Sequence, residues 1–411
     1  MAYQVNVGRR TTMLRALGLV GGARITSTAA QALSLLVLAR SLGPSDFAEF
    51  AAVLGALMAL NLISDGGATY AVGRHHDDPT TIIKILRAGR MLSAATMLIS
   101  VPVLVAFAIA TGSAVLVACL PLCLWVPLER QLEVSSAYLM SRNQQVPVGA
   151  AFLLRRLPTL LAVLLFASTA NLVWAFSFSM LITAGVANLY LGRQVADETA
   201  AGQREARPDG TTWRMLRPFW AAIAGQGVRQ IDVAVLSFAA GTAVAGIFAP
   251  ATRLVPALLL VPGTYTQLLL ARLATTKETL TLRAVAVLGL VTGAVFTPLA
   301  MTANHWIPLL LGDEYSASVP VVQIVIGSLV FAAMSSAFAS GLHAVDRASR
   351  VAAAVWTSAL TTLVLIAVLG SIHGGIGAAW AVAVGYALQF VLMAGAYRLK
   401  RQQAPTTVLA H

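Results

Sequence analysis

Apolar stretches of membrane-spanning length, separated by short polar segments, make up most of the chain. A helix needs about 20 apolar residues to cross roughly 30 Å of hydrocarbon, whereas the strands of a membrane barrel read as alternating segments of about ten residues. Only the first pattern occurs here, so the sequence predicts an all-α, polytopic membrane protein with about 12 transmembrane helices. The expected helices cover residues 15–41, 46–72, 88–111, 113–140, 147–168, 170–193, 214–240, 243–271, 281–303, 317–341, 349–370 and 375–397.

The longest polar interruption, "GRQVADETAAGQREARPDGTTWR" (Gly192–Arg214), lies at the midpoint of the chain and separates six expected helices from six. "GPSDFAEFA" (Gly43–Ala51) aligns without gaps on "GTAVAGIFA" (Gly241–Ala249), and each joins the first and second helix of its half. This echo predicts two pseudo-symmetric six-helix lobes, the internal-repeat plan of many transporters. The predicted division is an N-terminal lobe over 1–197, a cytoplasmic linker over 198–212 and a C-terminal lobe over 213–411.

Basic residues concentrate in alternate loops, and this bias predicts the orientation. The loop after the second expected helix carries Arg74, Lys84, Arg87 and Arg90, and the central loop carries Arg193, Arg204, Arg207, Arg214 and Arg217. The opposite loops contain no Lys or Arg except Arg40, at a helix end. Because Lys and Arg mark the cytoplasmic side, we expect a multi-pass protein of the bacterial cytoplasmic (inner) membrane with both termini in the cytoplasm.

Composition narrows the function classes. The chain is 58% hydrophobic and 11% charged, which excludes a water-soluble protein. Its net charge of +12 does not indicate nucleic acid, because there is no basic block and no basic patch interleaved with aromatic residues. No lysine follows a phosphate-binding glycine loop, and the histidines and cysteines lack metal-site spacing. We therefore expect no cofactor, no metal and no enzymatic activity.

Ionisable residues deep within the expected helices carry the chemistry. The deep cations are Arg24, Arg130, Arg155, Arg156, Arg229 and Arg253, and the deep acids are Asp65, Glu129, Glu133 and Asp232. Each costs roughly 2.5–3.5 kcal/mol to insert, so each must face protein or a water-filled cavity. The acids are candidates either for ion pairs or for proton or sodium coupling, and the sequence leaves both roles open.

Antiparallel register predicts which of these charges meet. For two consecutive antiparallel helices, the residue numbers of any two residues at equal depth add up to the same total. This rule places Arg24 beside Asp65 and Asp232 beside Arg253. The same rule places Glu133 beside Arg155 or Arg156. Glu133 also lies three residues from Arg130 on its own helix, close enough for an ion pair.

The cations outnumber the acids by two, and this surplus suits an anionic substrate such as a pyrophosphate, which the arginine fork holds bidentately. Polar stripes on the first and seventh helices predict a hydrated cleft. The stripes comprise Arg24, Ser27, Thr28, Gln31 and Ser34, and Gln226, Arg229, Gln230 and Ser237. The candidate pyrophosphate-binding residues are Arg24, Gln31, Gln226, Arg229 and Arg253. Simple helix packing through small polar residues is the alternative.

Several segments resemble bacterial polysaccharide exporters and O-antigen flippases of the multidrug/oligosaccharidyl-lipid/polysaccharide exporter (MOP) superfamily. "LARSLGPSDFAEFA" (Leu38–Ala51) and "DGGATYAVGR" (Asp65–Arg74) resemble their opening hairpin. "RQIDVAVLSFAAGTAVAGIFAPATRLV" (Arg229–Val255) is similar to the start of their second lobe. "LLLGDEYSASVPVVQIVIGSLVFAAM" (Leu309–Met334) and "GGIGAAWAVAVGYALQFVLM" (Gly374–Met393) are similar to their tenth and last helices. The likeness spans nearly the whole chain.

The resemblance implies a flippase that moves polyprenyl-pyrophosphate-linked oligosaccharide across the membrane by alternating access, for cell-surface polysaccharide (O-antigen, lipopolysaccharide) synthesis. It implies that Arg24 and Arg229, on the first and seventh helices, contact the pyrophosphate. Membrane lipid and the lipid-linked oligosaccharide are then partners, and a polysaccharide polymerase and chain-length proteins are candidates. The alternatives are an ion-coupled drug or small-metabolite exporter of the same superfamily and a membrane glycan polymerase or ligase.

Overall fold

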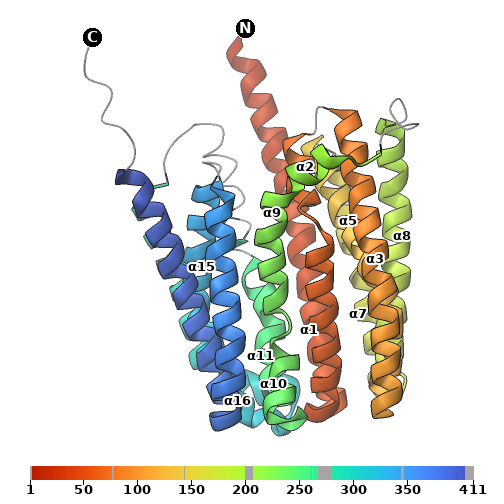
Figure 1. Ribbon diagram of the computed structural model, residues 1–411, viewed down its shortest axis with the longest axis vertical. Coiled ribbons are helices and arrows are strands. Elements are labelled where there is room, and N and C mark those ends of the chain that lie inside the picture. Colours follow the sequence, from red (N-terminus) through yellow and green to blue (C-terminus); the bar gives the residue numbers. More distant parts are fainter. Residues whose placement is uncertain are drawn as a thin grey trace. The chain divides into compact units, whose positions relative to one another are not determined.

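The computed structural model describes residues 2–75, 78–142, 144–199, 207–260, 262–263, 265–266, 280–343 and 347–402. These residues are almost entirely helical and contain no strand (Figure 1). Eight segments are long and apolar enough to cross a membrane, and α11 (Thr242–Leu258) is a shorter apolar helix. The all-helical, multi-pass membrane architecture predicted from hydrophobicity is therefore confirmed.

Chain contacts group the residues into two compact units, Met1–Ala234 and Val235–His411. The first unit contains α1 (Ala2–Ser64), α2 (Ala68–Arg74), α3 (Pro79–Thr111), α4 (Ala114–Ala118), α5 (Leu120–Ser141), α6 (Gln145–Leu154), α7 (Leu157–Phe166), α8 (Leu172–Thr199) and α9 (Gly210–Arg229). α10 (Asp232–Ala240) begins in this unit and continues past its boundary. The predicted lobes over 1–197 and 213–411 remain a prediction, and residues 200–206 of the predicted linker lie outside the described residues.

The second unit is built from α11, α13 (Leu282–Met301), α14 (Ala303–Leu311), the 3₁₀ turn η2 (Asp313–Ser318), α15 (Val319–His343) and α16 (Ala348–Gln402). α15 packs against α11, α13 and α16. Aromatic contacts join Phe338 of α15 to Phe390 and Tyr397 of α16. The Tyr397 hydroxyl donates to the Leu280 carbonyl at 2.9 Å, which fixes the approach to α13.

Two of the long helices are helical hairpins that turn at a glycine. Gly43 in α1 has φ 71° and Gly374 in α16 has φ 60°, a region that residues with a side chain rarely adopt. Figure 1 shows α1 descending to this turn and returning alongside. Each hairpin accounts for two of the expected helices, in place of a separate loop between them.

Three expected membrane helices are interrupted. The helix expected over 113–140 breaks at Cys119, between α4 and α5, and the helix expected over 147–168 breaks at Arg155–Arg156, between α6 and α7. Pro121 and Pro158 follow these breaks closely, and a proline lacks the N–H that would continue the ladder. The helix expected over 214–240 breaks at Gln230–Ile231, between α9 and α10.

Two expected loops are helical instead. α3 begins at Pro79 rather than near residue 88, because Asp78 caps it by accepting from the N–H groups of Thr80 and Thr81. Lys84, Arg87 and Arg90 therefore lie on the first turns of a helix, not in a loop. The expected extracytoplasmic loop "ANHWIPLLLGDEYSAS" forms α14 and η2. In the eighth expected helix, residues 267–271 lie outside the described residues.

The helix α9 packs onto the first unit through close backbone contacts. A Cβ at Gly67 would lie 2.7 Å from the Leu216 carbonyl oxygen, and one at Gly227 would lie 2.9 Å from the Ala59 carbonyl oxygen. The indole N–H of Trp220 donates to the Ile63 carbonyl at 2.8 Å. These contacts require glycine at two positions and fix α9 against α1 and α2.

We predict that Gly67→Ala destabilises the protein more than Gly112→Ala. Both glycines have positive φ, 85° and 67°, so alanine strains the backbone at either position by about 1–2 kcal/mol. Only at Gly67 does the added Cβ also meet α9, whereas nothing lies within 4 Å of a Cβ at Gly112. Thermal unfolding in detergent measures the difference, and equal losses for the two variants would contradict the close packing of α9.

An exposed ion pair joins the start of α9 to α3. Lys84 Nζ lies 2.7 Å from Asp209 Oδ2, while Asp209 also caps α9 by accepting from the N–H of Thr212. The hydrogen bonds from Lys84 and Thr212 hold the pKa of Asp209 well below its usual range. Because the pKa of this carboxyl is lower in the folded than in the unfolded state, its charged form stabilises the fold at pH values above the unfolded-state pKa. That stabilisation is lost as the pH falls through the folded-state pKa.

We therefore predict that amide protection in the first turn of α9 persists down to the ordinary aspartate pKa, about 4, and is lost only on further acidification. Hydrogen-exchange protection factors measure this. Asp209→Ala is expected to expose the turn already at neutral pH, because alanine cannot cap, whereas Asp78→Ala, the control, affects only the start of α3. Full protection of α9 in Asp209→Ala at neutral pH would refute the capping role.

Candidate functional site

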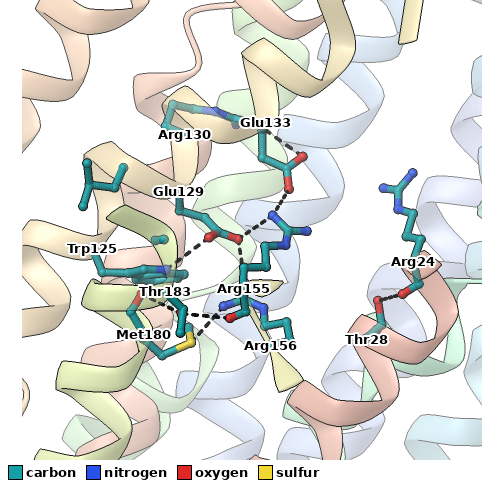
Figure 2. A network of polar contacts seen from close by, with 12 residues as sticks. Arg24, Thr28, Trp125, Glu129, Arg130, Glu133, Arg155, Arg156, Met180 and Thr183 are labelled. Carbon is teal, nitrogen blue, oxygen red and sulfur yellow. Dashed lines mark hydrogen bonds and ion pairs between the residues drawn. The ribbon is translucent and has the colours of Figure 1, made fainter. Parts of the chain in front are cut away.

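The charged residues of the first unit form a buried ionic cluster centred on Glu129 of α5. Glu129 Oε1 lies 2.9 Å from Arg155 Nη1 and 2.6 Å from Arg156 Nη2, so one carboxylate oxygen accepts from two guanidinium groups (Figure 2). Arg155 Nη1 also lies 2.7 Å from Glu133 Oε1. The side chain of Glu129 is 6% exposed and that of Arg156 4%, whereas Glu133 is 31% exposed.

The break between α6 and α7 brings the two arginines together. Because Arg155 and Arg156 lie in the break rather than in a continuous helix, both side chains reach Glu129 from adjacent positions. The break leaves backbone N–H and C=O groups without partners inside the helix, and such unsatisfied groups are costly within a membrane. The hydroxyl of Thr183 on α8 donates to the Arg155 carbonyl at 3.0 Å and satisfies one of them.

Further side chains hold the cluster in place, and the sequence analysis did not identify them. The indole N–H of Trp125 donates to Glu129 Oε2 at 3.1 Å, and the Arg156 guanidinium lies 5.7 Å from the same ring. Arg156 also donates to the sulfur of Met180 at 2.8 Å. Trp125 was identifiable in principle, because it lies four residues before Glu129 and therefore on the same helix face. Met180 gave no comparable signal.

A second ion pair joins Arg130 to the break after α1. Arg130 Nη1 lies 3.3 Å from Asp65 Oδ1, with both side chains buried. Asp65 also accepts from the N–H of Gly67 at 3.1 Å and from the hydroxyl of Thr69 at 2.6 Å. Its carboxylate thus supports the start of α2, and Arg130 compensates its charge. Arg130 Nη2 lies 4.0 Å from Glu133 Oε2, which links this pair to the Glu129 cluster.

The structure tests some of the pairings predicted from helix register. The contact of Glu133 with Arg155 is confirmed, and so is its i, i+3 ion pair with Arg130. The partners of Glu129 were not predicted, because the register rule assumed continuous helices. Asp65 pairs with Arg130, which lies on α5, a helix more distant in sequence. The predicted Arg24–Asp65 and Asp232–Arg253 pairings remain predictions.

The polar stripe of the first helix lies along the first segment of α1. Arg24 and Gln31 are half-buried, whereas Ser27 and Ser34 are buried. Thr28 donates to the Arg24 carbonyl at 2.9 Å, as Figure 2 shows. The stripe therefore has two buried hydroxyl positions that pack the helix, Ser27 and Ser34, and three partly accessible positions, Arg24, Thr28 and Gln31.

Arg229 and Asp232 lie on the two sides of the break in the seventh membrane helix. Arg229 is the last residue of α9 and Asp232 the first residue of α10, where its carboxylate accepts from the N–H of Val233 at 2.7 Å. A cation at a helix C-terminus and an anion at an N-terminus each gain typically 0.3–1 kcal/mol from the helix dipole. The two charges therefore stabilise both ends of a broken membrane helix.

The remaining candidate residues differ in exposure. Gln226 of α9 is exposed and Arg229 is half-buried. Arg253, in α11 of the second unit, is 8% exposed and Asp232 is 7% exposed. The structure thus places Arg24, Gln31, Gln226 and Arg229 in the first unit and Arg253 in the second.

The sequence matches no family model and no curated protein. Solved structures do match. An inward-facing multidrug resistance MATE family transporter of the MOP superfamily aligns with TM-score 0.69 at 13% identity, over 94% of this chain and 100% of its own. The lipid II flippase MurJ in an inward closed conformation aligns with TM-score 0.69 at 13% identity, over 92% and 87%. An outward-facing MATE family transporter of the MOP superfamily aligns with TM-score 0.61 at 13% identity, over 95% and 96%.

At these identities the likeness establishes the fold. The chain has the fold of MOP superfamily transporters along nearly its whole length, as the resemblance of its sequence segments predicted. The neighbours that share this fold are multidrug resistance MATE family transporters and the lipid II flippase MurJ.

We predict that Glu129→Gln destabilises the protein by about 3–5 kcal/mol, because it leaves two buried guanidinium groups without their shared carboxylate. Glu133→Gln is the matched control, and its loss should be smaller because Glu133 is partly exposed and binds only at the edge of the cluster. Reversible unfolding in mixed micelles measures both. If Glu129→Gln costs no more than Glu133→Gln, Glu129 is not the centre of the cluster.

Proposed function

We propose that the protein is a flippase of the cytoplasmic membrane that moves a polyprenyl-pyrophosphate-linked oligosaccharide across the bilayer by alternating access, for synthesis of a cell-surface polysaccharide. Both termini are assigned to the cytoplasm because of the positive-inside bias. The proposal is supported by the buried network that engages the acids of the first unit with arginines, and by the surplus of deep cations over deep acids in the sequence.

The neutral cluster takes up most of the acids. Asp65, Glu129 and Glu133 are matched by Arg130, Arg155 and Arg156 within one network. The other ionisable residues deep in the predicted membrane helices are Arg24, Arg229, Arg253 and Asp232, whose formal charge sums to a net positive value. An anion is therefore the substrate that this second group suits, and a pyrophosphate matches the surplus in charge and in its bidentate oxygens.

Two of these cations are supplied by neighbouring helices of the first unit. α9 packs along the second segment of α1, with Gly227 against Ala59. The antiparallel register about the turn at Gly43 places Ala59 level with the segment between Arg24 and Gln31. Arg229, two residues beyond Gly227, is thus at the depth of the polar stripe of α1. We assign Arg24 and Arg229 to the pyrophosphate, with Gln31 and Gln226 as hydrogen-bonding neighbours in the first unit.

The helix break at Arg229 supports this assignment. Discontinuous membrane helices commonly end at substrate or ion sites, because their unsatisfied end groups and dipoles interact with charge. Here Arg229 ends α9, and α10 begins three residues later at Asp232, whose carboxylate already accepts from the N–H of Val233 at that helix N-terminus. The guanidinium is therefore the group at the break that favours an anion.

Export of a drug or small metabolite is the second candidate, supported by the shared fold with MATE transporters. A cationic drug needs carboxylates in its site, and the acids of the first unit, Asp65, Glu129 and Glu133, are engaged by arginines. This engagement favours the flippase. Glu133 is the most exposed acid of the cluster and hence the best candidate for coupling to a proton or sodium ion.

We predict that Arg229→Ala lowers flipping by tenfold or more while the protein remains folded, because a charge-assisted hydrogen bond is worth about 1.5–3 kcal/mol. The assay reconstitutes the purified protein in liposomes that carry a polyprenyl-pyrophosphate oligosaccharide on one leaflet and measures sugar on the other. Arg229→Lys keeps the charge without the fork and is expected to retain part of the activity.

Arg40→Ala is the control, since Arg40 is an exposed arginine near the turn of α1. Normal flipping by Arg229→Ala would refute the role of Arg229. Efflux of a cationic drug from the same vesicles, without movement of the oligosaccharide in the unchanged protein, would establish the exporter instead.

A further inference from the structure

A separate polar cavity lies in the first unit between α3, α5 and α8. It has a volume of about 210 Å³, and its polar lining consists of Arg87, Arg90, Gln131, Ser135 and Asn188. A water molecule occupies about 30 Å³ in the liquid, so the cavity has room for a multi-atom group. Neither the proposed substrate arginines nor the residues of the Glu129 cluster line it.

The lining is cationic. Its described residues include two arginines from successive turns of α3 and no carboxylate. With its amide oxygen facing Arg90, Gln131 accepts from Nε at 2.9 Å and from Nη2 at 3.3 Å, which orients that guanidinium. Arg87 is half-buried and Arg90 exposed, so the cavity opens at the Arg90 side. Guanidinium groups in this arrangement suit a phosphate.

The surroundings of the cavity indicate which kind of phosphate. On α8, an exposed stripe leads to the lining residue Gly192 through Phe178, Ile182, Val186 and Leu189. On α3, the exposed apolar residues Met91 and Leu98 lie on the face beside Arg90. Both apolar faces belong to membrane-spanning segments. A ligand whose charged group occupies the cavity thus meets hydrocarbon-facing surface immediately beside it.

We propose that this cavity binds the phosphate headgroup of an anionic phospholipid, whose acyl chains lie along the exposed faces of α3 and α8. Basic cavities between membrane helices at the cytoplasmic side are suited to such headgroups. The positive-inside bias assigns this end of α3 to the cytoplasmic leaflet. The site differs from that of the transported substrate, so it does not depend on the proposed flippase activity.

Native mass spectrometry of the full-length protein in detergent tests this, with phosphatidylglycerol, phosphatidylethanolamine and inorganic phosphate titrated separately. Phosphatidylglycerol is expected to bind most tightly. Arg87→Gln and Arg90→Gln are each expected to weaken it roughly fivefold, the usual contribution of one basic residue near an anionic headgroup. Arg283→Gln, at an exposed arginine near the start of α13, is the matched control and should leave binding unchanged.

Gly192→Leu provides a second variant that keeps both arginines. A Cβ at Gly192 meets nothing within 4 Å, so the fold accommodates leucine while its side chain occupies the opening of the cavity. Gly192→Leu is expected to weaken the binding of phosphatidylglycerol to a similar degree. Unchanged binding in Arg87→Gln, Arg90→Gln and Gly192→Leu would overturn the proposal. Equal binding of phosphatidylethanolamine, or of inorganic phosphate alone, would overturn the choice of an anionic lipid.

Discussion

The first unit depends on one shared carboxylate. Glu129 accepts from Arg155 and Arg156 through the same oxygen, and from Trp125 through the other. Burying charge in a membrane is costly, and the attraction offsets that cost only when the geometry is close and the remaining groups are hydrogen-bonded. The break between α6 and α7 supplies that geometry, and Thr183 satisfies the carbonyl that the break releases.

The ionic cluster also explains why acids and arginines occur within such apolar helices. Asp65, Glu129 and Glu133 connect α5 to the break after α1 and to the break between α6 and α7, so they hold the helices of the first unit together. Arg229 and Asp232, three residues apart, lie on the two sides of a further helix break, where each charge stabilises one helix end.

Hydrophobicity was enough to predict the all-helical membrane architecture, because hydrocarbon imposes helix length and internal hydrogen bonding on any chain. The fold shared with MOP superfamily transporters was predicted from the resemblance of several segments. Helix register correctly placed Glu133 beside Arg155 across one turn. It could not place Glu129, since the partners of that residue depend on a break that shifts two consecutive side chains toward it. Nor did apolar periodicity reveal the early start of α3, where a capping Asp78 extends the helix through charged residues.

The packing of α9 was equally hidden from the sequence. Hydrophobic pattern predicted a helix there, but the contacts of Gly67 with Leu216 and of Gly227 with Ala59 join segments far apart in the chain, and nothing local to either glycine indicates its partner. With the antiparallel register about Gly43, the contact of Gly227 with Ala59 puts Arg229 level with Gln31 of the polar stripe, about two helical turns from Arg24. The proposed substrate site therefore depends on tertiary packing, although its residue types were recognisable from charge alone.

The central claim is that the membrane arginines fall into a structural and a ligand-binding group. The most direct measurement is the affinity for a polyprenyl-pyrophosphate oligosaccharide, determined together with thermal stability, for single glutamine substitutions of Arg24, Arg229, Arg130 and Arg156. The account predicts that Arg24→Gln and Arg229→Gln lose affinity at nearly unchanged stability, whereas Arg130→Gln and Arg156→Gln lose stability first. Equal loss of affinity in all four folded variants, or none in Arg24→Gln and Arg229→Gln, would contradict it.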